Sequence, residues 1–285
     1  MKRAWVFSSL LLLLAGCGQL DSIPYSPAQT PETWLKIQPF TEINFGLQKI
    51  YFMQPSTSAI VYLLGILTIG VGIYFLKIRQ NQKSRLWWGV ALLLWGLGAI
   101  LAGTSYEAFS YAIKCAGREA CLWTSWWEIA YLVVTVWSLD AMMLAVAHSS
   151  TAGGLRRGLS IYALVNAIAY FALIVVSVFV PVKFLISFEF LLVVGAPTFV
   201  ALFVINLLNY LKTKSMPELM LVGAWLWMAV TIAAYFGYYM TGWTDMLWAK
   251  GMWFSENDVL HIFLIVWMLY LGFGLAPRVM DISQP

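Results

Sequence analysis

Five side chains have types and positions that could support chemistry: Ser105, Glu107, Glu128, Asp258 and His261. All lie near the ends of predicted membrane helices, on one side of the membrane, and ionisable groups inside membrane spans are costly and mark candidate sites. Asp258 and His261 are three residues apart, so they share one helix face. Glu107, Glu128 and His261 could hold a metal ion such as zinc, with one carboxylate as general base and Ser105 stabilising an oxyanion.

The same residues also have structural explanations. Ser125–Glu128 and Ser255–Asp258 match the capping-box pattern, and so does Ser215–Glu218, where we expect no site. A histidine such as His261 is often a hydrogen-bonded structural residue. Glu107 resists the capping explanation because it is near a helix C-terminus, where the helix dipole disfavours a carboxylate. Glu107 must therefore be solvated, protonated or paired.

Two further acidic residues are predicted inside the membrane, Asp140 and Glu189. Asp140 is deep in the third span, and we expect it to be protonated or bonded to Asn166 or a hydroxyl, with a role in proton transfer as the alternative. Glu189 is expected about two turns into the fifth span, and its facing cannot be read from the sequence.

The elements that position these residues follow from composition. The chain has 285 residues, of which 61% are hydrophobic, 16% aromatic and 11% charged, with a net charge of +4. Soluble domains carry about 25% charged residues. This composition excludes a cytosolic enzyme, a disordered chain and a nucleic-acid binder, and it leaves membrane lipids as the expected surroundings, with protein partners unknown.

Seven apolar windows are long enough to cross a bilayer, so we predict an all-α bundle of seven transmembrane helices within residues 57–277. The predicted spans are Thr57–Leu76, Leu86–Glu107, Trp126–Ala147, Gly158–Val180, Phe184–Leu211, Pro217–Met240 and Asp258–Ala276.

Basic residues predict the orientation. They gather in the first, third and fifth loops and in the tail 278–285, whereas the alternate loops are richer in acids. Because positive loops stay in the cytoplasm, the N-terminus is expected outside the cytoplasm and the C-terminus inside.

The N-terminus predicts a bacterial export signal. Residues 1–17 combine a basic start with a short apolar stretch that ends in Leu-Ala-Gly-Cys, which resembles a lipobox with Cys17 as the acylated residue. An uncleaved first helix is the alternative. Residues 18–56 contain repeated prolines and indicate an extracytoplasmic linker. Ile43, Leu47, Ile50 and Tyr51 have helical spacing, so an interfacial helix and an extended linker are both open. These features place the chain in a bacterial inner membrane.

The other two cysteines, Cys115 and Cys121, both lie in the second loop, on the oxidising side. We predict a disulfide between them. Metal ligation by the two thiolates is the alternative, although that loop has no further cysteine or histidine.

Segments 103–109, 127–129 and 253–261 resemble motifs of the CREST superfamily, seven-helix membrane proteins that include alkaline ceramidases and progestin/adiponectin-type receptors. The resemblance implies a zinc site built from helices two, three and seven that activates water for amide hydrolysis. Ser105 and His261 match that pattern, and Glu128 replaces an aspartate. Phe109 and Asn257 stand where the superfamily has histidines.

Three functions remain open. Loss of two expected histidines favours a non-catalytic sensor, receptor or assembly protein that keeps a polar site at Glu107, Glu128 and His261. The alternatives are a metal-dependent lipid amide or ester hydrolase and a proton-coupled transporter that uses Asp140 and Glu189. The seventh span has no lysine for retinal, and the chain has no P-loop or dinucleotide-binding motif.

Overall fold

The computed structural model describes residues 19–23, 25, 27–46 and 48–282. The predicted signal sequence and Cys17 lie outside these residues. Within these residues, seven helices are long and apolar enough to cross a membrane, which confirms the predicted all-α seven-helix class. They are α3 (Pro55–Lys77), α4 (Lys83–Ala102) with the π-helix η1 (Gly103–Ala108), α6 (Trp126–Ser150), α7 (Gly153–Phe179), α8 (Phe188–Thr213), α9 (Met216–Met240), and α11 (Glu256–Leu269) with the π-helix η3 (Tyr270–Leu275).

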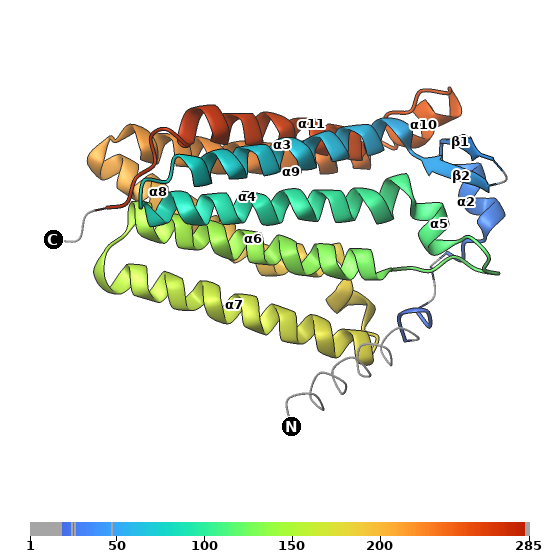
Figure 1. The fold of residues 1–285 in the computed structure, drawn as a ribbon, viewed down its shortest axis with the longest axis horizontal. Helices are drawn as coiled ribbons and strands as arrows, with labels where there is room; N and C mark the ends of the chain where they lie inside the picture. Colours follow the sequence, from blue (N-terminus) through green and yellow to red (C-terminus); the bar gives the residue numbers. More distant parts are fainter. Residues whose placement is uncertain (1–18, 24, 26, 47, 283–285) are drawn as a thin grey trace.

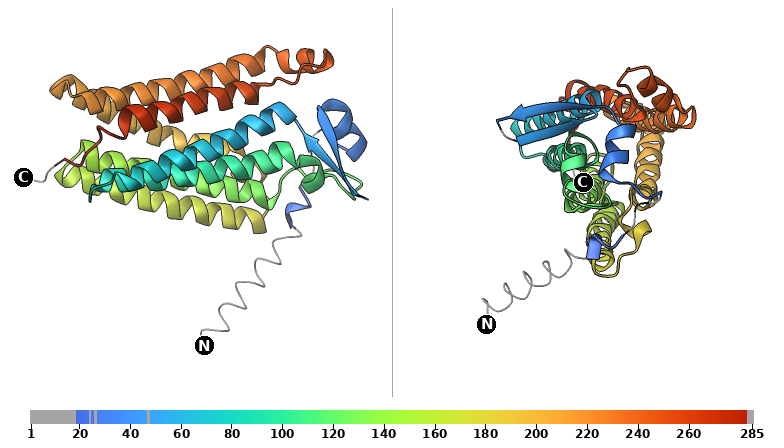
Figure 2. Two further views of the ribbon diagram at one scale, coloured as in Figure 1. Left: turned by 45° about the horizontal axis from the view of Figure 1, so that its top comes forward. Right: turned by 90° about the vertical axis from the view of Figure 1, so that its right-hand side faces the viewer.

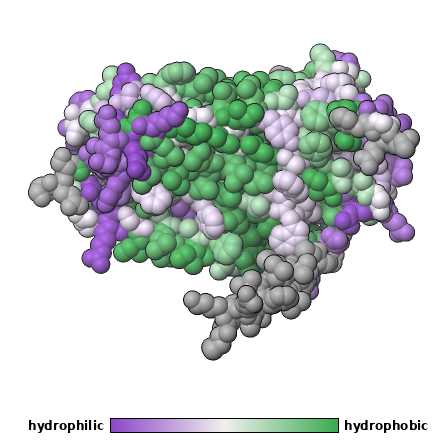
Figure 3. Space-filling view, viewed as in Figure 1, coloured by the Kyte–Doolittle hydropathy of each residue, from purple (hydrophilic) through white to green (hydrophobic). Residues whose placement is uncertain are grey.

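Six of these helices form a closed arrangement around a common centre. Along it, α6 contacts α4, α4 contacts α3, α3 contacts α11, α11 contacts α9, α9 contacts α8, and α8 returns to α6. Helix α7 packs against the outside of α6 (Figures 1 and 2). The middle of the surface is apolar and the hydrophilic residues gather at the two ends (Figure 3), as expected for a protein whose solvent is lipid.

Glycines bring α3 and α4 close together. A Cβ atom placed on Gly96 would lie 2.7 Å from the carbonyl oxygen of Gly65, and one placed on Gly72 would lie 3.1 Å from the carbonyl oxygen of Gly89. Small residues at such crossings let two membrane helices approach through their backbones. The α3–α4 pair therefore depends on the absence of side chains at these positions.

A small cap covers one end of the bundle, which we call the hairpin end. It consists of α2 (Pro31–Ile37), the antiparallel hairpin β1 (Phe40–Phe45) and β2 (Gln48–Met53), and α5 (Ser110–Lys114) with the loop that follows it. Trp34 and Met53 are buried there against Cys115 and Cys121. The two cysteines form a disulfide, as predicted.

The hairpin overturns the interfacial helix proposed for Ile43 to Tyr51. Ile43 lies in β1, Ile50 and Tyr51 lie in β2, and Leu47 is outside the described residues; Phe45 pairs with Gln48 at the end of the hairpin. Gly46 begins the turn with a φ of 60°, a conformation that glycine adopts at little cost. Aromatic and β-branched residues such as Phe40, Ile43 and Tyr51 also favour strands, and this preference outweighs a helical spacing of only four apolar residues.

The start of the fifth span also differs from the prediction. The short 3₁₀ helix η2 (Lys183–Ile186) precedes it, and α8 begins at Phe188 after Ser187, whose hydroxyl accepts a hydrogen bond from the backbone N–H of Phe190. Glu189 is therefore in the first turn of α8, not two turns inside the membrane. A charge at that position is favoured by the helix dipole.

The C-terminal tail closes the other end of the bundle, which we call the tail end. The buried guanidinium of Arg85 donates hydrogen bonds to the carbonyl oxygens of Val279 and Ile78, at 2.9 and 2.7 Å, and to that of Pro277. The carboxylate of Asp281 accepts from the backbone N–H groups of Lys83 and Ser84, at 2.8 and 2.7 Å. The tail thus caps the start of α4.

Candidate functional site

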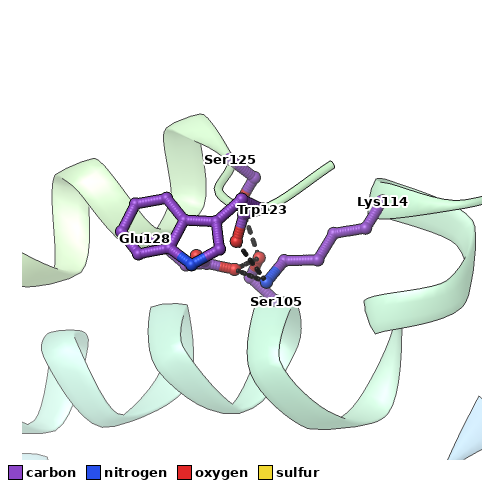
Figure 4. Close-up of polar contacts among 5 residues, drawn as sticks. All are labelled: Ser105, Lys114, Trp123, Ser125 and Glu128. Carbon is purple, nitrogen blue, oxygen red and sulfur yellow. Dashed lines mark hydrogen bonds and ion pairs between the residues drawn. The ribbon is translucent and has the colours of Figure 1, made fainter. Parts of the chain in front are cut away.

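A buried ion pair lies under the cap at the hairpin end (Figure 4). The Nζ atom of Lys114, the last residue of α5, is 2.6 Å from Oε1 of Glu128 in the first turn of α6, and both side chains are 3% exposed or less. Ser105 in η1 donates to the same carboxylate oxygen at 2.8 Å, and Lys114 also donates to the carbonyl oxygen of Trp123 at 3.2 Å. The predicted residues Ser105 and Glu128 are therefore hydrogen-bonded neighbours, and Lys114 pairs with the same carboxylate oxygen of Glu128.

Lys114 is the member of this group that the sequence did not reveal. Its position in the second loop, directly before Cys115, carries no sign that the ammonium turns inward. In the structure the ammonium lies 5.0 Å from the ring centroid of Tyr106 and 6.0 Å from that of Trp34, within the range of cation–π attraction. These aromatic rings and the disulfide loop hold the charge inside the protein.

Glu128 does not take part in a capping box. Ser125 occupies the N-cap position of α6, but its side chain makes no capping hydrogen bond and lies 2.6 Å from the hydroxyl of Ser105 instead. The third predicted box fails in the same way, because Glu218 accepts a hydrogen bond from Asn206. In both cases a buried partner on another helix replaces the local one.

The charge of Glu128 also acts on Tyr25 in the N-terminal segment. Burial raises the pKa of the Tyr25 hydroxyl, and the negative charge of Glu128 raises it further. Ser105 is fully buried and is not among the residues that line the central cavity described below. The Lys114–Glu128–Ser105 group is thus an enclosed network that ties the disulfide loop to η1 and α6.

Asp258 forms the capping box expected at the start of α11. Its Oδ2 atom accepts from the backbone N–H and the hydroxyl of Ser255, at 2.6 and 2.9 Å. The hydroxyl of Thr57 on α3 donates to the same oxygen at 2.8 Å. This contact was not predicted, and it joins the first and last spans of the bundle at the hairpin end.

Three buried polar atoms near this contact lack a hydrogen-bond partner among the described residues: Oε2 of Glu107, Oδ1 of Asp258 and Nδ1 of His261. Glu107 lies in η1 and is 3% exposed, and Asp258 is close enough to interact with its charge. Single π-helical turns are frequent at functional sites. A further charged group placed beside these two carboxyl groups would also be buried away from water, which is costly unless the group is paired.

The structure does not bring the three predicted metal ligands together. Within the described part of the chain, no group of three or more His, Cys, Asp or Glu side chains is arranged to hold a metal ion. Glu128 is engaged by the ammonium of Lys114, whose positive charge opposes a cation at that carboxylate. Glu107, Glu128 and His261 therefore do not act as one ligand set in this arrangement.

A central cavity of about 720 Å³ lies between the six helices of the closed arrangement. Its wall is almost entirely apolar, with Leu139, Met228 and Leu264 as typical members. Among the described lining residues, Tyr131, Thr135 and His261 carry a hydroxyl or imidazole group; His261 is the only one of type Asp, Glu, Lys, Arg or His, and it is 8% exposed. Ligand pockets typically have about 300–1,000 Å³, apolar walls and a few polar groups that orient the ligand.

The cavity opens sideways between α8 and α9. Leu139, Met228 and Leu264 line it and are buried, so contact with the cavity alone does not make a side chain exposed. In contrast, Val200 on α8 and Leu226 on α9 line it and are 62% and 51% exposed. The other exposed lining residues on these two helices are the small side chains Ala196, Ala229 and Ala233.

Asp140 lies away from this cavity, between α6 and α7. Asn166 donates to its Oδ1 atom at 2.9 Å, which is the partner expected from the sequence, and its Oδ2 atom has no partner among the described residues. Asp140 and Glu189 are on different faces of the bundle, one against α7 and the other at the start of α8, and neither lines the cavity.

Comparison with known proteins adds no relative. No protein family matches the chain, and a search of curated proteins found no match.

Proposed function

We propose that this chain is a multi-pass receptor or sensor of the bacterial inner membrane that binds an apolar, chain-like ligand in its central cavity and does not transform it. The observation that carries the proposal is the apolar cavity of about 720 Å³, whose wall includes His261, a residue whose Nδ1 atom has no hydrogen-bond partner among the described residues. A buried polar atom without a partner costs free energy, and a ligand that supplies one offsets that cost.

The membrane supplies this ligand. The cavity mouth between α8 and α9 is formed by apolar residues at the level of the lipid chains, with Val200 and Leu226 on its two sides. A chain-like molecule can pass from the bilayer into the cavity there without crossing water. Lipid recognition of this kind needs no opening at either end of the bundle.

The polar end of the ligand is neutral. His261 is one turn from Asp258, and the carboxyl groups of Asp258 and Glu107 are buried without a positive partner among the described residues. A carboxylate or phosphate headgroup placed beside them would be buried without a positive partner among the described residues, which is costly. A hydroxyl group can hydrogen-bond to His261 without that cost, so the ligand is a neutral amphiphile such as a long-chain alcohol.

The hairpin end lies outside the cytoplasm in this proposal. The loops at the tail end carry most of the basic residues, and such loops remain in the cytoplasm. The disulfide of Cys115 and Cys121, at the hairpin end, suits an oxidising compartment. A lipid anchor on Cys17 would hold the N-terminus at that same side.

A lipid hydrolase of the CREST type finds less support. Ser105 and Glu128, to which the resemblance assigns catalytic roles, belong to the enclosed network with Lys114. A substrate held in the cavity could reach His261 but would not meet Ser105. The resemblance itself stays a prediction about the fold and ancestry of the chain.

Photolabelling tests the proposal. A straight-chain alcohol with a diazirine on its alkyl chain is added to the purified protein in lipid nanodiscs, and labelled peptides are mapped by mass spectrometry. We expect labels on cavity residues of α8, α9 and α11, competed by unlabelled alcohol. Ala229→Trp, which narrows the mouth, should reduce labelling at least tenfold, whereas Leu164→Trp on the lipid face of α7 should not.

The same experiment separates the alternatives. Labelling restricted to the outer, lipid-facing surface would overturn the proposal. Release of a hydrolysed product from an amide or ester analogue of the probe, lost in Ser105→Ala, would favour the hydrolase instead.

A further inference from the structure

We infer that Trp225 sets the length of the chain that the cavity accepts, and that Asn206 is the positioning residue that fixes its indole ring. This inference rests on the proposed function and adds a determinant of ligand specificity to it.

Aromatic side chains form the floor of the cavity, toward the tail end. On each of α4, α8 and α9, the lining residue nearest that end is aromatic: Trp95, Phe203 and Trp225. His261 lies near the opposite, hairpin end, in the second turn of α11. A chain whose hydroxyl meets His261 therefore extends toward Trp225, and its length is limited by that floor.

Trp225 is held by contacts on three sides. Its indole stacks on Trp88 with ring centroids 6.0 Å apart, and its edge meets Phe199 at the same centroid distance. Its Nε1–H donates to Oδ1 of Asn206 at 2.8 Å. The ring is 4% exposed. A ring fixed in this way cannot swing aside for a longer chain without breaking a buried hydrogen bond.

Asn206 is itself fixed by a polar network at the tail end. Its Nδ2 group donates to Oε2 of Glu218 at 2.7 Å and to the hydroxyl of Ser150 at 2.9 Å. The asparagine is fully buried and joins α8 to α6 and α9. Glu218 is in the first turn of α9. Buried amides with all partners in place hold one orientation, which here is the orientation that Trp225 needs.

The hydrogen bond to Trp225 gives a reason for burying the polar side chains of Asn206, Glu218 and Ser150 at this place. A tryptophan that only filled space could pack without a partner on Nε1, as the neighbouring Trp88 does within the part of the chain that the structure describes. Trp225 instead receives a dedicated acceptor, which in turn is oriented by a carboxylate and a serine. Three buried polar side chains, those of Asn206, Glu218 and Ser150, together fix the position of one indole ring.

Chain-length selectivity tests this inference. Straight-chain alcohols of increasing length compete with the diazirine probe for the cavity, and the longest alcohol that still competes defines the limit. In wild-type protein we expect competition to strengthen with length and then fall sharply. Trp225→Ala should move the limit to chains longer by several methylene groups, and Trp225→Phe should move it by less.

Two further variants separate the roles of the residues. Asn206→Leu removes the hydrogen-bond acceptor of Trp225 and should make the length limit less sharp. Alcohols longer than the wild-type limit should then compete with the probe at concentrations within about threefold of those needed for the best alcohol. Trp137→Ala removes a tryptophan on α6 that does not line the cavity and should leave the limit unchanged. If Trp225→Ala does not fold, Phe203→Leu enlarges the same floor and should lengthen the limit as well.

The outcomes distinguish this inference from the proposed function. If wild-type protein binds the probe in the cavity but the limit stays unchanged in folded Trp225→Phe and Phe203→Leu, the inference is wrong and the receptor proposal stands. If no probe enters the cavity of the wild-type protein, both fail.

Discussion

The ammonium of Lys114 lies 2.6 Å from the carboxylate of Glu128, and both side chains are almost completely buried. The pair joins the end of the disulfide-closed loop to the first turn of α6. Through this ion pair, the second loop and the start of α6 are connected beneath the cap.

Removing Lys114 should destabilise the protein strongly. In Lys114→Met the carboxylate of Glu128 is left buried without a counter-charge, and breaking a buried ion pair in this way costs about 3–5 kcal/mol. Thermal unfolding in detergent measures the loss. The exposed pair of Arg118 and Asp21, at 3.4 Å, is the control, because Arg118→Met should cost less than about 1 kcal/mol.

A double variant sharpens this prediction. Lys114→Met combined with Glu128→Gln has no uncompensated charge and should recover much of the stability lost in the single variant. Equal stability of Lys114→Met and Arg118→Met would show that the buried pair contributes little.

The disulfide of Cys115 and Cys121 should resist mild reduction in the folded protein, because the two residues are 0% and 4% exposed. We expect no labelling of Cys115 or Cys121 by a maleimide after treatment with a mild reductant, and full labelling of both after the same treatment in denaturant. Cys115→Ser with Cys121→Ser should lower the free energy of unfolding by about 2–4 kcal/mol. Rapid labelling without denaturant would contradict the enclosed cap.

Because α3 and α4 approach closely, we expect two glycine-to-alanine substitutions to differ sharply in their effect on the stability of the protein. Gly96→Ala places a Cβ atom 2.7 Å from the carbonyl oxygen of Gly65 and should destabilise the bundle by about 1–3 kcal/mol. Gly158→Ala on α7 is the matched control, since nothing lies within 4 Å of its added methyl group. That variant should be neutral or slightly stabilising. Similar melting temperatures for the two variants would argue against the backbone contact.

The tail should respond to acid through Asp281. Burial alone would raise the pKa of this carboxyl, but hydrogen bonds from the backbone N–H groups of Ser84 and Lys83 outweigh it and hold the pKa below its usual value. A lowered pKa means that the carboxylate stabilises the fold above its unfolded pKa, about 3.9. This contribution is lost as the pH falls through the folded pKa.

Hydrogen exchange at the amides of Lys83 and Ser84 measures this effect. At neutral pH these amides should exchange more slowly in wild-type protein than in Asp281→Asn. After intrinsic exchange rates are taken into account, the difference should vanish once the carboxyl of the wild-type protein is protonated. A difference that persists unchanged into strong acid would show that another group protects them.

The sequence alone predicted seven spans and the disulfide because both depend on local and compositional rules. A run of about twenty apolar residues must be a helix in lipid, whatever its neighbours. The capping box of Asp258 and the Asp140–Asn166 contact were also foreseeable, since they depend on spacing and on residue type at a given depth. Only 11% of the chain is charged, so few partners competed for each polar group.

The tertiary structure decided which way the side chains face, and with it the candidate site. Glu128 pairs with the inward-turned Lys114, and the described residues do not bring Glu107, Glu128 and His261 together as one metal-ligand group. The cavity and its aromatic floor arise from six helices at once, with Trp225 from α9 held by Asn206 from α8. The sequence of an apolar helix is nearly the same whether its face contacts lipid, another helix or a cavity. The hydrophobic pattern therefore does not tell which way each side chain faces. Packing between distant segments alone determines it.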